Sequence, residues 1–508
     1  MAVLVSLCLF ALALLLLAAD RFWRRRRLPP GPLGLPLVGN LLSLAGGRHM
    51  HVVFAEWRRR YGKLVTIHFG PVEMVLVNDW QLIVDTFVKQ GDLFAGRHRN
   101  PFFTRFRNGE NGLIFTDGAK WRTQRRFALR TMRNFGFGRN IMERCISEEI
   151  AHFLRAVERS VVQHDGVVDV YPLLQHCIGN VIHKLICGHR LDEADPTIRQ
   201  IKYQLDKIQT LLYEDWRAAL IFWRCAPYLP FMRAVYRAFD EARDFFFETF
   251  AAEIDRHRRQ RARRRDDAAP PADFIDAYLD EMELERDATF NETQLTAVLI
   301  DILLAGLETT VTTLHWAFLY FVHYPDVQRA IHAEIDANVE NGAEINMTHK
   351  KKLPYLTATI MEVQRHLNLL PINMFHTTMA DVTVAGYRLP KGTVVVPQIS
   401  AVLADESVFP APREFLPQRF LEEEEEEEGG GEARTRLRVP DEFVPFSVGK
   451  RKCLGEAMAK AELLMLVGNF LKKFQVSGVP GEPLPSMKPR LIGNMQPVPY
   501  KCLIRRRV

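Results

Sequence analysis

The chain has 508 residues, 47% hydrophobic and 25% charged, which is the composition of a globular protein able to bury a substantial core. Its formal net charge of +6 is small for this length, and no stretch interleaves basic and aromatic residues, so a nucleic-acid-binding protein is excluded. The seven cysteines are odd in number and contain no C-x-x-C pair. This pattern argues against a disulfide framework and a cysteine-based zinc site, and it favours a reducing compartment.

Residues 1–20 predict one membrane anchor helix. Residues 2–19 are almost wholly apolar, and the basic cluster DRFWRRRR, from Asp20 to Arg27, follows this stretch instead of preceding it. The order favours a retained helix whose basic flank, with everything after it, stays in the cytosol. A cleaved signal peptide is the alternative. Residues 21–32 form a basic and proline-rich linker, which predicts a stiff spacer or, alternatively, a ligand for a partner protein.

The rest of the chain, residues 33–508, shows mainly helical periodicity. Helices are predicted over residues 50–60, 76–90, 118–134, 141–160, 198–214, 232–260, 291–322, 325–340, 354–368 and 455–473. Short strands are predicted at 64–69, 73–77, 383–388 and 393–397. Runs of helices with a few isolated strands, and no G-x-G-x-x-G motif after a strand, indicate a mainly α domain with a small β component.

Two like-charged segments predict inserted, solvated surface. Residues 256–267 are strongly basic, and residues 422–428 are seven consecutive glutamates followed by three glycines up to residue 431. Like charges repel, so residues 422–431 are expected to be a disordered acidic and glycine-rich insert. Contact with anionic lipid is the alternative role for the basic run.

The stretch FSVGKRKCLG, from Phe446 to Gly455, surrounds Cys453 with cations and glycines. Cations and backbone N–H groups stabilise a thiolate, which is a nucleophile or a metal ligand. The pattern resembles no cysteine-protease motif, whereas one thiolate suffices as the axial ligand of a porphyrin iron. Phe446 would then pack under the ring, and Gly449 and Gly455 would allow close approach. On this stretch alone, a buried inert thiol is an equal alternative.

Four further motifs precede this stretch in order. They are W-x-x-x-R from Trp121 to Arg125, A-G-x-E-T-T from Ala305 to Thr310, E-x-x-R from Glu362 to Arg365, and P-x-x-F-x-P-x-R-F from Pro412 to Phe420. Together with F-x-x-G-x-R-x-C-x-G around Cys453, they resemble the cytochrome P-450 family, the haem-thiolate monooxygenases, over about residues 28–504. The resemblance implies the cytochrome P-450 fold, haem b as cofactor, and Cys453 as the axial ligand of its iron.

The resemblance places oxygen activation on the helix predicted over residues 291–322. Gly306, next to Ala305, has no side chain, so the helix surface can lie against a flat ring and leave room for dioxygen. Glu308 and Thr309 put a carboxylate and a hydroxyl beside that gap, and the matching pair in the family relays protons. The alternative for Thr309 is a hydrogen bond to its own helix backbone.

Haem also carries two propionates, and the resemblance assigns these to Trp121, Arg125, His376 and Arg451. Trp121 and Arg125 share a helix face because they lie one turn apart; a surface arginine packed on the tryptophan is the alternative. His376 departs from the family pattern, since many relatives have proline directly before the histidine and this chain has Phe375.

Glu362 and Arg365 lie one helical turn apart and can form an ion pair. By resemblance, they join Arg419 in a buried network that sets the fold around the Cys453 loop. We interpret all three as structural, and single substitutions are expected to lose haem because one charge would be left buried without its partner.

The resemblance also implies a lipophilic substrate, such as a fatty acid, a steroid or a xenobiotic. The residues that fall in pocket-lining segments of relatives, with ordinary core packing as the alternative, are Phe102, Phe103, Phe106, Phe115, Leu370, Met374 and Met495. An NADPH-dependent flavoprotein reductase is the expected partner on the proximal face, steered by charge. The basic residues of that face are Arg122, Arg126, Arg130, Arg133, Lys450, Lys452 and Lys460.

The stretches QGDLFAGR and PFSVGKRKCLGE look most like the animal microsomal branch, so we expect the endoplasmic reticulum membrane, with the catalytic domain facing the cytosol. Two other functional classes remain open. A haem-thiolate isomerase or dehydratase would not need the Glu308–Thr309 pair, and its turnover would not need NADPH. A non-catalytic haem- or lipid-binding protein would show no substrate-dependent NADPH consumption coupled to an oxygenated product.

Overall fold

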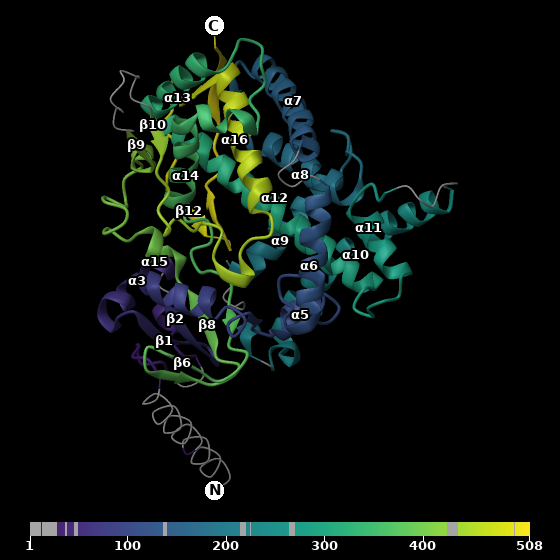
Figure 1. The fold of residues 1–508 in the computed structure, drawn as a ribbon, viewed down its shortest axis with the longest axis vertical. Helices are drawn as coiled ribbons and strands as arrows, with labels where there is room; N and C mark the ends of the chain where they lie inside the picture. Colours follow the sequence, from purple (N-terminus) through teal and green to yellow (C-terminus); the bar gives the residue numbers. More distant parts are fainter. Residues whose placement is uncertain are drawn as a thin grey trace, which may run out of the picture.

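The computed structural model describes residue 12 and residues 28–35, 38–44, 49–135, 140–213, 220–223, 225–263, 270–423, 435–491 and 493–507. A sheet-containing region lies nearer the N-terminus, and helices form the larger part of the molecule (Figure 1). The long helix α12 (Glu292–His323) passes through the centre and contacts α8, α10, α14 and α16. The predicted anchor, residues 1–20, lies outside the described residues apart from Leu12.

The helices that surround α12 differ widely in length. They are α2 (Leu41–Leu44), α3 (Met50–Tyr61), α4 (Trp80–Ile83), α5 (Pro101–Phe106), α6 (Gly118–Asn134), α7 (Asn140–Gln163), α8 (Tyr171–Cys187), α9 (Thr197–Tyr213), α10 (Arg233–Arg263), α11 (Phe274–Glu283), α13 (Pro325–Asn338), α14 (Pro354–Leu367), α15 (Ile399–Leu403) and α16 (Glu456–Lys473). A π-helix, η1 (Val84–Lys89), continues α4.

The largest sheet has the strand order β1-β2-β8-β5-β3. Its strands are β1 (Leu64–Phe69), β2 (Val72–Val77), β8 (Val394–Pro397), β5 (His376–Thr377) and β3 (Gly96–Arg97). β2 and β8 are parallel, and Arg97 lies opposite His376 in the β3–β5 pair. The sheet therefore brings together residues separated by almost 300 positions in the sequence.

Smaller sheets carry the remaining strands. They are β4 (Val167–Val168), β6 (Val382–Val384), β7 (Tyr387–Leu389), β9 (Leu421–Glu423), β10 (Thr435–Leu437), β11 (Phe474–Ser477), β12 (Pro489–Leu491), β13 (Met495–Pro497) and β14 (Cys502–Arg506). β11, β14 and β4 form a three-stranded sheet, and the others pair in twos. The mainly α architecture with a small β component is thus confirmed.

Among the described residues, α12 is the one helix long and apolar enough to span a membrane. It is a core helix, because 78% of its most apolar 18-residue window is buried inside the protein. Asn291 caps its start by accepting a hydrogen bond from the backbone N–H of Gln294. Helices packed on every side explain why its sequence is apolar around its whole circumference.

Nine of the ten predicted helices match observed helices to within three residues at each end. The prediction for residues 76–90 is wrong at its start, because β2 runs to Val77 and Asp79 then caps α4 by accepting from the Leu82 N–H. The strand predicted at 383–388 is a hairpin of β6 and β7. Its turn residues, Ala385 and Gly386, have positive φ angles of 45° and 86°, as a tight hairpin requires.

The described parts of the two charged segments belong to regular elements. α10 continues to Arg263, so most of the basic run is helical, and Arg258 and Arg261 form ion pairs with residues of α12 and α11. The repulsion between like charges is therefore offset by neighbouring acids. Glu422 and Glu423 belong to β9, which pairs with β10, and residues 424–434 lie outside the described residues.

The proline-rich linker already packs on the domain at its end. Leu28 is buried, and the Pro30 carbonyl accepts a hydrogen bond from the Thr66 N–H of β1. A Cβ on Gly31 would lie 1.9 Å from the Thr66 carbonyl oxygen, so only glycine fits this contact. Residues 28–31 of the predicted linker therefore pack on the folded domain.

Acid sensitivity is expected from His315 of α12. Its side chain is buried, Nε2 has no hydrogen-bond partner among the residues that the structure describes, and the ring stacks on Tyr500 with centroids 4.5 Å apart. Burial lowers the pKa of His315 from 6.5 to about 3. Between these pH values the unfolded chain binds a proton that the folded protein does not, so stability falls as the pH falls.

Replacing His315 by phenylalanine should remove this dependence while keeping the stacking on Tyr500. At pH 5, the variant is expected to regain about 2 kcal/mol relative to wild type, since each unit below 6.5 costs about 1.4 kcal/mol. Urea unfolding of both proteins at pH 7.5 and pH 5 measures the difference. An equal loss of stability in both proteins on acidification would contradict the assignment to His315.

Candidate functional site

The loop that carries Cys453 is anchored on the π-helix η1. The Cys453 N–H donates to the Phe446 carbonyl at 3.0 Å, and a short 3-10 turn spans Gly449–Arg451. Gly449 has φ = 72°, and a Cβ there would lie 1.9 Å from the Phe87 carbonyl oxygen. Both the backbone conformation and the close approach therefore require glycine at this position.

Cys453 itself is reached by solvent, although protein occupies most of the space around its sulfur. Burial raises the pKa of the thiol above its ordinary value, and the Gly455 N–H, Arg125 and Lys452 only partly oppose this. The sequence predicted that nearby cations favour the thiolate form of Cys453. Without a bound metal ion this prediction is wrong, because the pKa of the thiol is raised and not lowered. A coordinated metal ion deprotonates a thiol outright, so the loop remains suited to a ligand.

Cys502 offers a useful contrast with Cys453. It lies in β14, is fully buried, and its thiol contacts the Val168 carbonyl oxygen at 3.7 Å. Burial raises its pKa to about 12, with a further contribution from Asp169. Cys502 is therefore a packing residue of the three-stranded sheet.

The middle of α12 exposes a short patch in an otherwise buried helix. Ala305 is exposed, and Leu304, Gly306 and Thr309 are half-buried. Ala305 and Thr309 lie one turn apart, so they share a face, and the Thr309 hydroxyl donates to the Ala305 carbonyl at 2.6 Å. The exposed face of Ala305 and Thr309, in the middle of a core helix, is a surface on which a flat ligand can lie.

Gly306 has a different role from the one predicted. A Cβ at Gly306 would lie 2.6 Å from Cδ1 of Ile182, on α8. The glycine therefore allows α8 and α12 to pack closely. The expectation that its missing side chain opens space for a ring is wrong, because the open face is that of Ala305 and Thr309.

Glu308 is buried and turned toward α9 and β13. One carboxylate oxygen lies 3.3 Å from Lys202 Nζ, and the other accepts from Gln496 at 3.0 Å and from Gln209 at 3.4 Å. Burial lowers the pKa of Lys202, but the Glu308 carboxylate and the Tyr171 hydroxyl outweigh it and raise the pKa above its ordinary value. Lys202 is therefore a permanent cation. The sequence does not indicate this role of Lys202, because the contact joins two separate helices.

Three arginines converge beside the Cys453 loop. The guanidinium of Arg451 lies 3.7 Å from the ring centroid of Trp121, and that of Arg125 lies 5.7 Å from it. Burial, together with the charges of Arg97 and Arg125, lowers the pKa of Arg451 to about 8. Burial and Arg125 likewise lower the pKa of Arg97 to about 9. Arginine does not give up its proton in proteins, so these shifts indicate that the guanidiniums are held in an unfavourable place, first by burial and second by the charges of the neighbouring arginines.

Backbone carbonyls hold these guanidiniums, and no carboxylate among the described residues does so. The oxygens that accept from them belong to Ala95, Leu113 and Thr116 for Arg451, Ile114 and Phe375 for Arg97, and Lys452 for Arg125. Asp117 is the acid that opposes the crowding, and its oxygens contact the Arg97 backbone N–H and the exposed Arg99. Two buried guanidiniums, those of Arg97 and Arg451, and the half-buried Arg125 therefore lie beside one acid that Arg99 also contacts, so their positive charge is only partly compensated and suits the propionates of haem.

Arg97 is the member of this cluster that the sequence analysis did not single out. The stretch QGDLFAGR contains it, and its pairing opposite His376 in the sheet places it at the site. His376 is buried, and its Nδ1 lies 2.7 Å from the Phe94 carbonyl oxygen, so Nδ1 carries the proton. Burial, and next the charge of Arg97, lowers the pKa of His376 well below its ordinary value. The imidazole is thus neutral, and its Nε2 has no proton to donate to a propionate.

The predicted network of Glu362, Arg365 and Arg419 is observed. Arg365 donates to both carboxylate oxygens of Glu362, at 2.7 and 2.8 Å, and Arg419 donates to the same carboxylate at 3.1 Å. The side chains of Glu362 and Arg365 are at most 1% exposed. Arg365 also donates to the carbonyls of Leu403 and Pro412, so the network fastens α14 to the chain that follows α15.

A second buried clamp, at Asp301, was not predicted. Its carboxylate accepts from Arg107 at 2.6 and 2.9 Å and from the backbone N–H groups of Leu113 and Ile114 at 2.7 and 2.9 Å. A Cβ on Gly112 would lie 2.4 Å from one of its oxygens. Asp301 thus fixes the loop after α5 against α12, one side of the candidate site.

The residues predicted to line a pocket have different surroundings. Phe102 and Phe106 are core residues that pack on Phe239 of α10, with ring centroids 4.0 and 6.4 Å away. Phe103 and Phe115 are only half-buried and stack at 4.5 Å. Leu370 is exposed, Met374 is half-buried and Met495 is buried.

The basic residues predicted for the proximal face are exposed: Arg122, Arg126, Arg130, Arg133, Lys450, Lys452 and Lys460. Several are paired with acids, such as Arg130 with Glu281 and Lys460 with Glu456. Beside them, a hollow of about 550 Å³ lies between α4, η1 and the Cys453 loop, and Trp80 and Phe446 are among its lining residues.

The comparison with known families agrees with this geometry. The Cytochrome P450 family model matches residues 29–504, and the chain therefore belongs to the cytochrome P450 family. Its members are haem-thiolate monooxygenases, so the protein is an oxidoreductase that uses haem b with an axial cysteine thiolate.

Curated relatives of this chain are animal microsomal cytochromes P450. Cytochrome P450 2D27 of Mesocricetus auratus is 33% identical and covers 98% of this chain and 97% of its own length. Cytochrome P450 2H1 of Gallus gallus is 33% identical over 93% of this chain and 92% of its own. Cytochrome P450 2C23 of Rattus norvegicus is 32% identical over 95% and 94%.

Proposed function

We propose that this protein is a membrane-anchored monooxygenase that oxidises a lipophilic organic substrate, such as a fatty acid, a steroid or a xenobiotic. Electrons come from NADPH through a separate flavoprotein reductase. The observation that carries the proposal is the partly compensated guanidinium cluster beside the solvent-reached Cys453. This combination fits an iron porphyrin with two carboxylates better than an inert thiol.

Different residues of this chain would bind different parts of haem. When bound, haem supplies the activation of dioxygen and the transfer of one oxygen atom. Cys453 is the iron ligand, and Trp121, Arg125, Arg451 and the added Arg97 receive the propionates. The residues assigned to contacts along the ring are Ala305, Gly306, His376, Phe446, Gly449 and Gly455, of which Gly306 acts through the packing of α12 on α8.

Glu308 and Thr309 are the proposed proton relay. The Thr309 hydroxyl is on the exposed face of α12, whereas Glu308 is held by Lys202. For Glu308 to pass a proton toward Thr309, its side chain must leave this ion pair or act through a water molecule. The relay is therefore coupled to α9, the helix that carries Lys202.

Glu308→Gln is expected to lower the rate of product formation by roughly 100-fold, the low end of what a positioned acid contributes. NADPH consumption should continue, because the haem site is untouched, so the product formed per NADPH falls. The matched control is Asp206→Asn, which removes the other, half-exposed carboxylate partner of Lys202. Equal coupling of product to NADPH in Glu308→Gln and in Asp206→Asn would exclude Glu308 from the relay.

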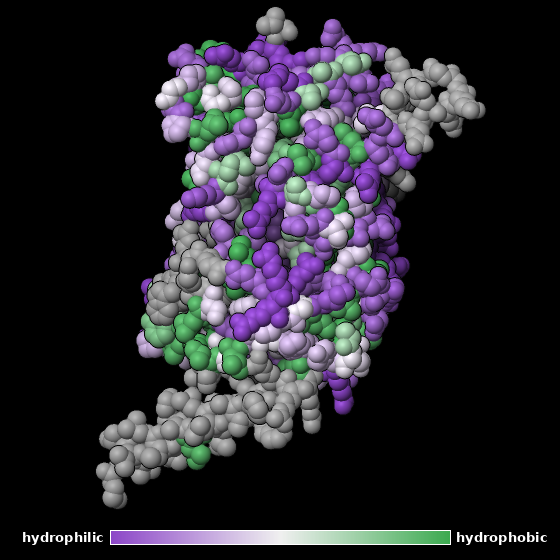
Figure 2. Space-filling model, turned by 90° about the vertical axis from the view of Figure 1, so that its left-hand side faces the viewer, coloured by the Kyte–Doolittle hydropathy of each residue, from purple (hydrophilic) through white to green (hydrophobic). Residues whose placement is uncertain are grey.

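The endoplasmic reticulum membrane is the proposed location, with residues 1–20 as the single anchor. The segment after the linker exposes Leu33 and Leu42, at 81% and 65%, and Phe69 contacts Phe222 of the segment 220–223 at 4.9 Å. In Figure 2, hydrophobic side chains gather at the lower end of the face shown, whereas its upper part is mainly hydrophilic. An apolar rim at this end suits contact with lipid.

The reductase is proposed to dock on the exposed basic residues of α6 and the Cys453 loop. Positive charge there would steer an acidic partner and raise its association rate, mostly at low ionic strength. The hollow lined by Trp80 and Phe446 is on the same side as the loop, and it could receive an apolar side chain of that partner.

The test of the proposed function is the absorption spectrum of the full-length protein, reduced with dithionite and exposed to carbon monoxide. A strongly red-shifted Soret band is expected in wild type and not in Cys453→Ser. The control is Cys502→Ser, which should keep the band because Cys502 packs in β14. Folded wild type without haem, or the same band in Cys453→Ser, would overturn the assignment.

A further inference from the structure

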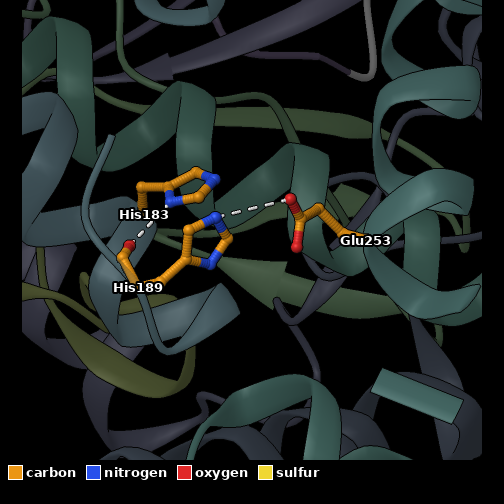
Figure 3. Close-up of side chains that lie close together, drawn as sticks. All are labelled: His183, His189 and Glu253. Carbon is orange, nitrogen blue, oxygen red and sulfur yellow. Dashed lines mark hydrogen bonds and ion pairs between the residues drawn. The ribbon is translucent and has the colours of Figure 1, made fainter. Parts of the chain in front are cut away.

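A cluster of two histidines and a glutamate lies where α8 and α10 meet. His183 comes from α8, His189 from the loop just after it, and Glu253 from α10 (Figure 3). His183 is buried, while the side chains of His189 and Glu253 are 36% and 18% exposed. The oxidation chemistry of Cys453 uses none of them, and the cluster would be accessible from solvent through His189.

The three side chains lie close enough together for one metal ion to bind between them. One nitrogen of each ring and one oxygen of Glu253 all lie within 4.8 Å of one another. Nε2 of His189 is 3.7 Å from Oε1 of Glu253, which is too long for a hydrogen bond. Two ligands of a tetrahedral zinc ion, each about 2.0–2.1 Å from it, are roughly 3.3 Å apart.

The other nitrogen of each ring is already held by a backbone carbonyl. Nδ1 of His183 lies 2.9 Å from the His189 oxygen, and Nδ1 of His189 lies 3.0 Å from the Cys187 oxygen. A carbonyl only accepts, so Nδ1 of His183 carries the proton and its Nε2 presents a lone pair. His189 has the same arrangement in the tautomer whose Nδ1 donates to the Cys187 carbonyl. A metal-bound histidine usually donates its other ring N–H to a carbonyl or carboxylate oxygen in this way.

Arg256 completes the outer contacts. It donates to the second oxygen of Glu253 at 2.9 Å and to the Cys187 carbonyl at 2.7 Å. Its guanidinium is also 2.9 Å from Nδ1 of His189, and because a guanidinium only donates, this contact favours the other tautomer of His189. Zinc bound at Nε2 would select the tautomer in which Nδ1 donates to the Cys187 carbonyl. Arg256 thereby orients Glu253 and leaves the oxygen Oε1 to face the imidazole of His189.

The neighbouring cluster of His257, Asp273 and Asp276 lacks these features. Nδ1 of His257 is engaged by the Glu253 carbonyl at 2.7 Å and Nε2 by Asp273 at 2.9 Å, so no lone pair remains. Asp273 also caps α11 by accepting from the Asp276 N–H. This second cluster is a structural ion pair, and the contrast shows that the first is not simply a polar junction between helices.

We propose that His183, His189 and Glu253 bind one divalent zinc ion, which fastens α8 to α10. A water molecule or Asp195, which is close enough for its charge to interact with both imidazoles, completes the coordination. The proposal is independent of the haem chemistry, because none of these residues belongs to the haem site.

The experiment is zinc binding by the purified full-length protein. The protein is stripped with a chelator, equilibrated with zinc chloride and separated from free metal. The molar ratio of zinc to protein is then measured. The protein concentration is taken from amino-acid analysis, so that the haem content of the sample does not affect the ratio. Wild type is expected to retain one zinc ion per chain, with a zinc X-ray absorption spectrum that shows nitrogen or oxygen neighbours at about 2.0–2.1 Å.

His189→Ala and Glu253→Gln each remove one ligand. We expect zinc affinity to fall by more than the roughly 10- to 100-fold that loss of an outer contact costs. His152→Ala, at a half-buried histidine of α7, is the matched control and should retain the ion. Zinc should also raise the melting temperature of wild type and of His152→Ala, but not that of His189→Ala.

Two results would overturn the proposal. One is wild type that holds no zinc after separation. The other is equal retention by wild type, His189→Ala and Glu253→Gln, since the metal would then be bound adventitiously by other histidines. Circular dichroism of each variant establishes that it is folded, and His189→Ala is the decisive variant because its side chain is partly exposed.

Discussion

Replacing Arg365 by methionine is expected to destabilise the folded protein by about 3–5 kcal/mol and to prevent retention of haem. The substitution leaves Glu362 buried without its bidentate partner, because only Arg419 and the Leu416 N–H would still reach its carboxylate. It also frees the carbonyls of Leu403 and Pro412 from their donor. Methionine fills a similar volume, so the loss reports the charge and not a cavity.

Urea unfolding and the haem content of the purified variant measure these effects. The matched control is Arg388→Met, because Arg388 pairs with Asp381 at the surface and its side chain is 77% exposed. That variant should lose no more than about 1 kcal/mol. If the two variants lost the same stability, the network around Glu362 would not be a structural requirement.

Gly449→Ala is expected to destabilise the Cys453 loop by at least about 3 kcal/mol and to lower haem content strongly. Two costs add at this position. Alanine is strained at φ = 72°, and its Cβ would overlap the Phe87 carbonyl oxygen, a rigid backbone atom of η1. Relief requires the loop to move away from η1, and Cys453, four residues later, would move with it.

Gly392→Ala separates these two costs. Gly392 has a similar φ of 86°, but a Cβ there would meet no atom within 4 Å. This variant should lose only about 1–2 kcal/mol, from strain alone, and should keep its haem. Haem content and urea unfolding compare the two variants, and equal losses would mean that the contact with Phe87 has no consequence.

The sequence predicted the fold best where one period dominates a long segment. α12 and α14 were found within a residue because their apolar pattern is continuous. α8 was missed, since Gly179 and Asn180 interrupt its pattern, although both face α9 and the adjacent loop in the fold. α11 was missed because it follows two prolines and a charged run that together predicted a surface insert.

At the candidate site, prediction succeeded for residues that belong to the recognised motifs and failed for residues outside them that the fold brings to the site. Trp121, Arg125 and Arg451 meet as expected. Arg97 and Lys202 could not be found, because strand pairing brings the first to the cluster and packing between helices brings the second to Glu308. The sequence indicated that Gly306 matters, but the neighbour that requires a glycine is Ile182 of α8 and not a bound ring. A sequence does not show toward which neighbour a Cβ at a given position would point.

The crowding of Arg97, Arg125 and Arg451 has a consequence for how the protein is made in the cell. A newly synthesised chain must bury two of these guanidiniums and bring all three together, with only Asp117 nearby to offset their charge, so we expect the folded chain to be less stable before haem carboxylates bind. The amount of folded protein in the cell would then depend on the supply of haem more closely than on the amount of messenger RNA. Chains made during haem shortage would remain open longer and would be degraded first.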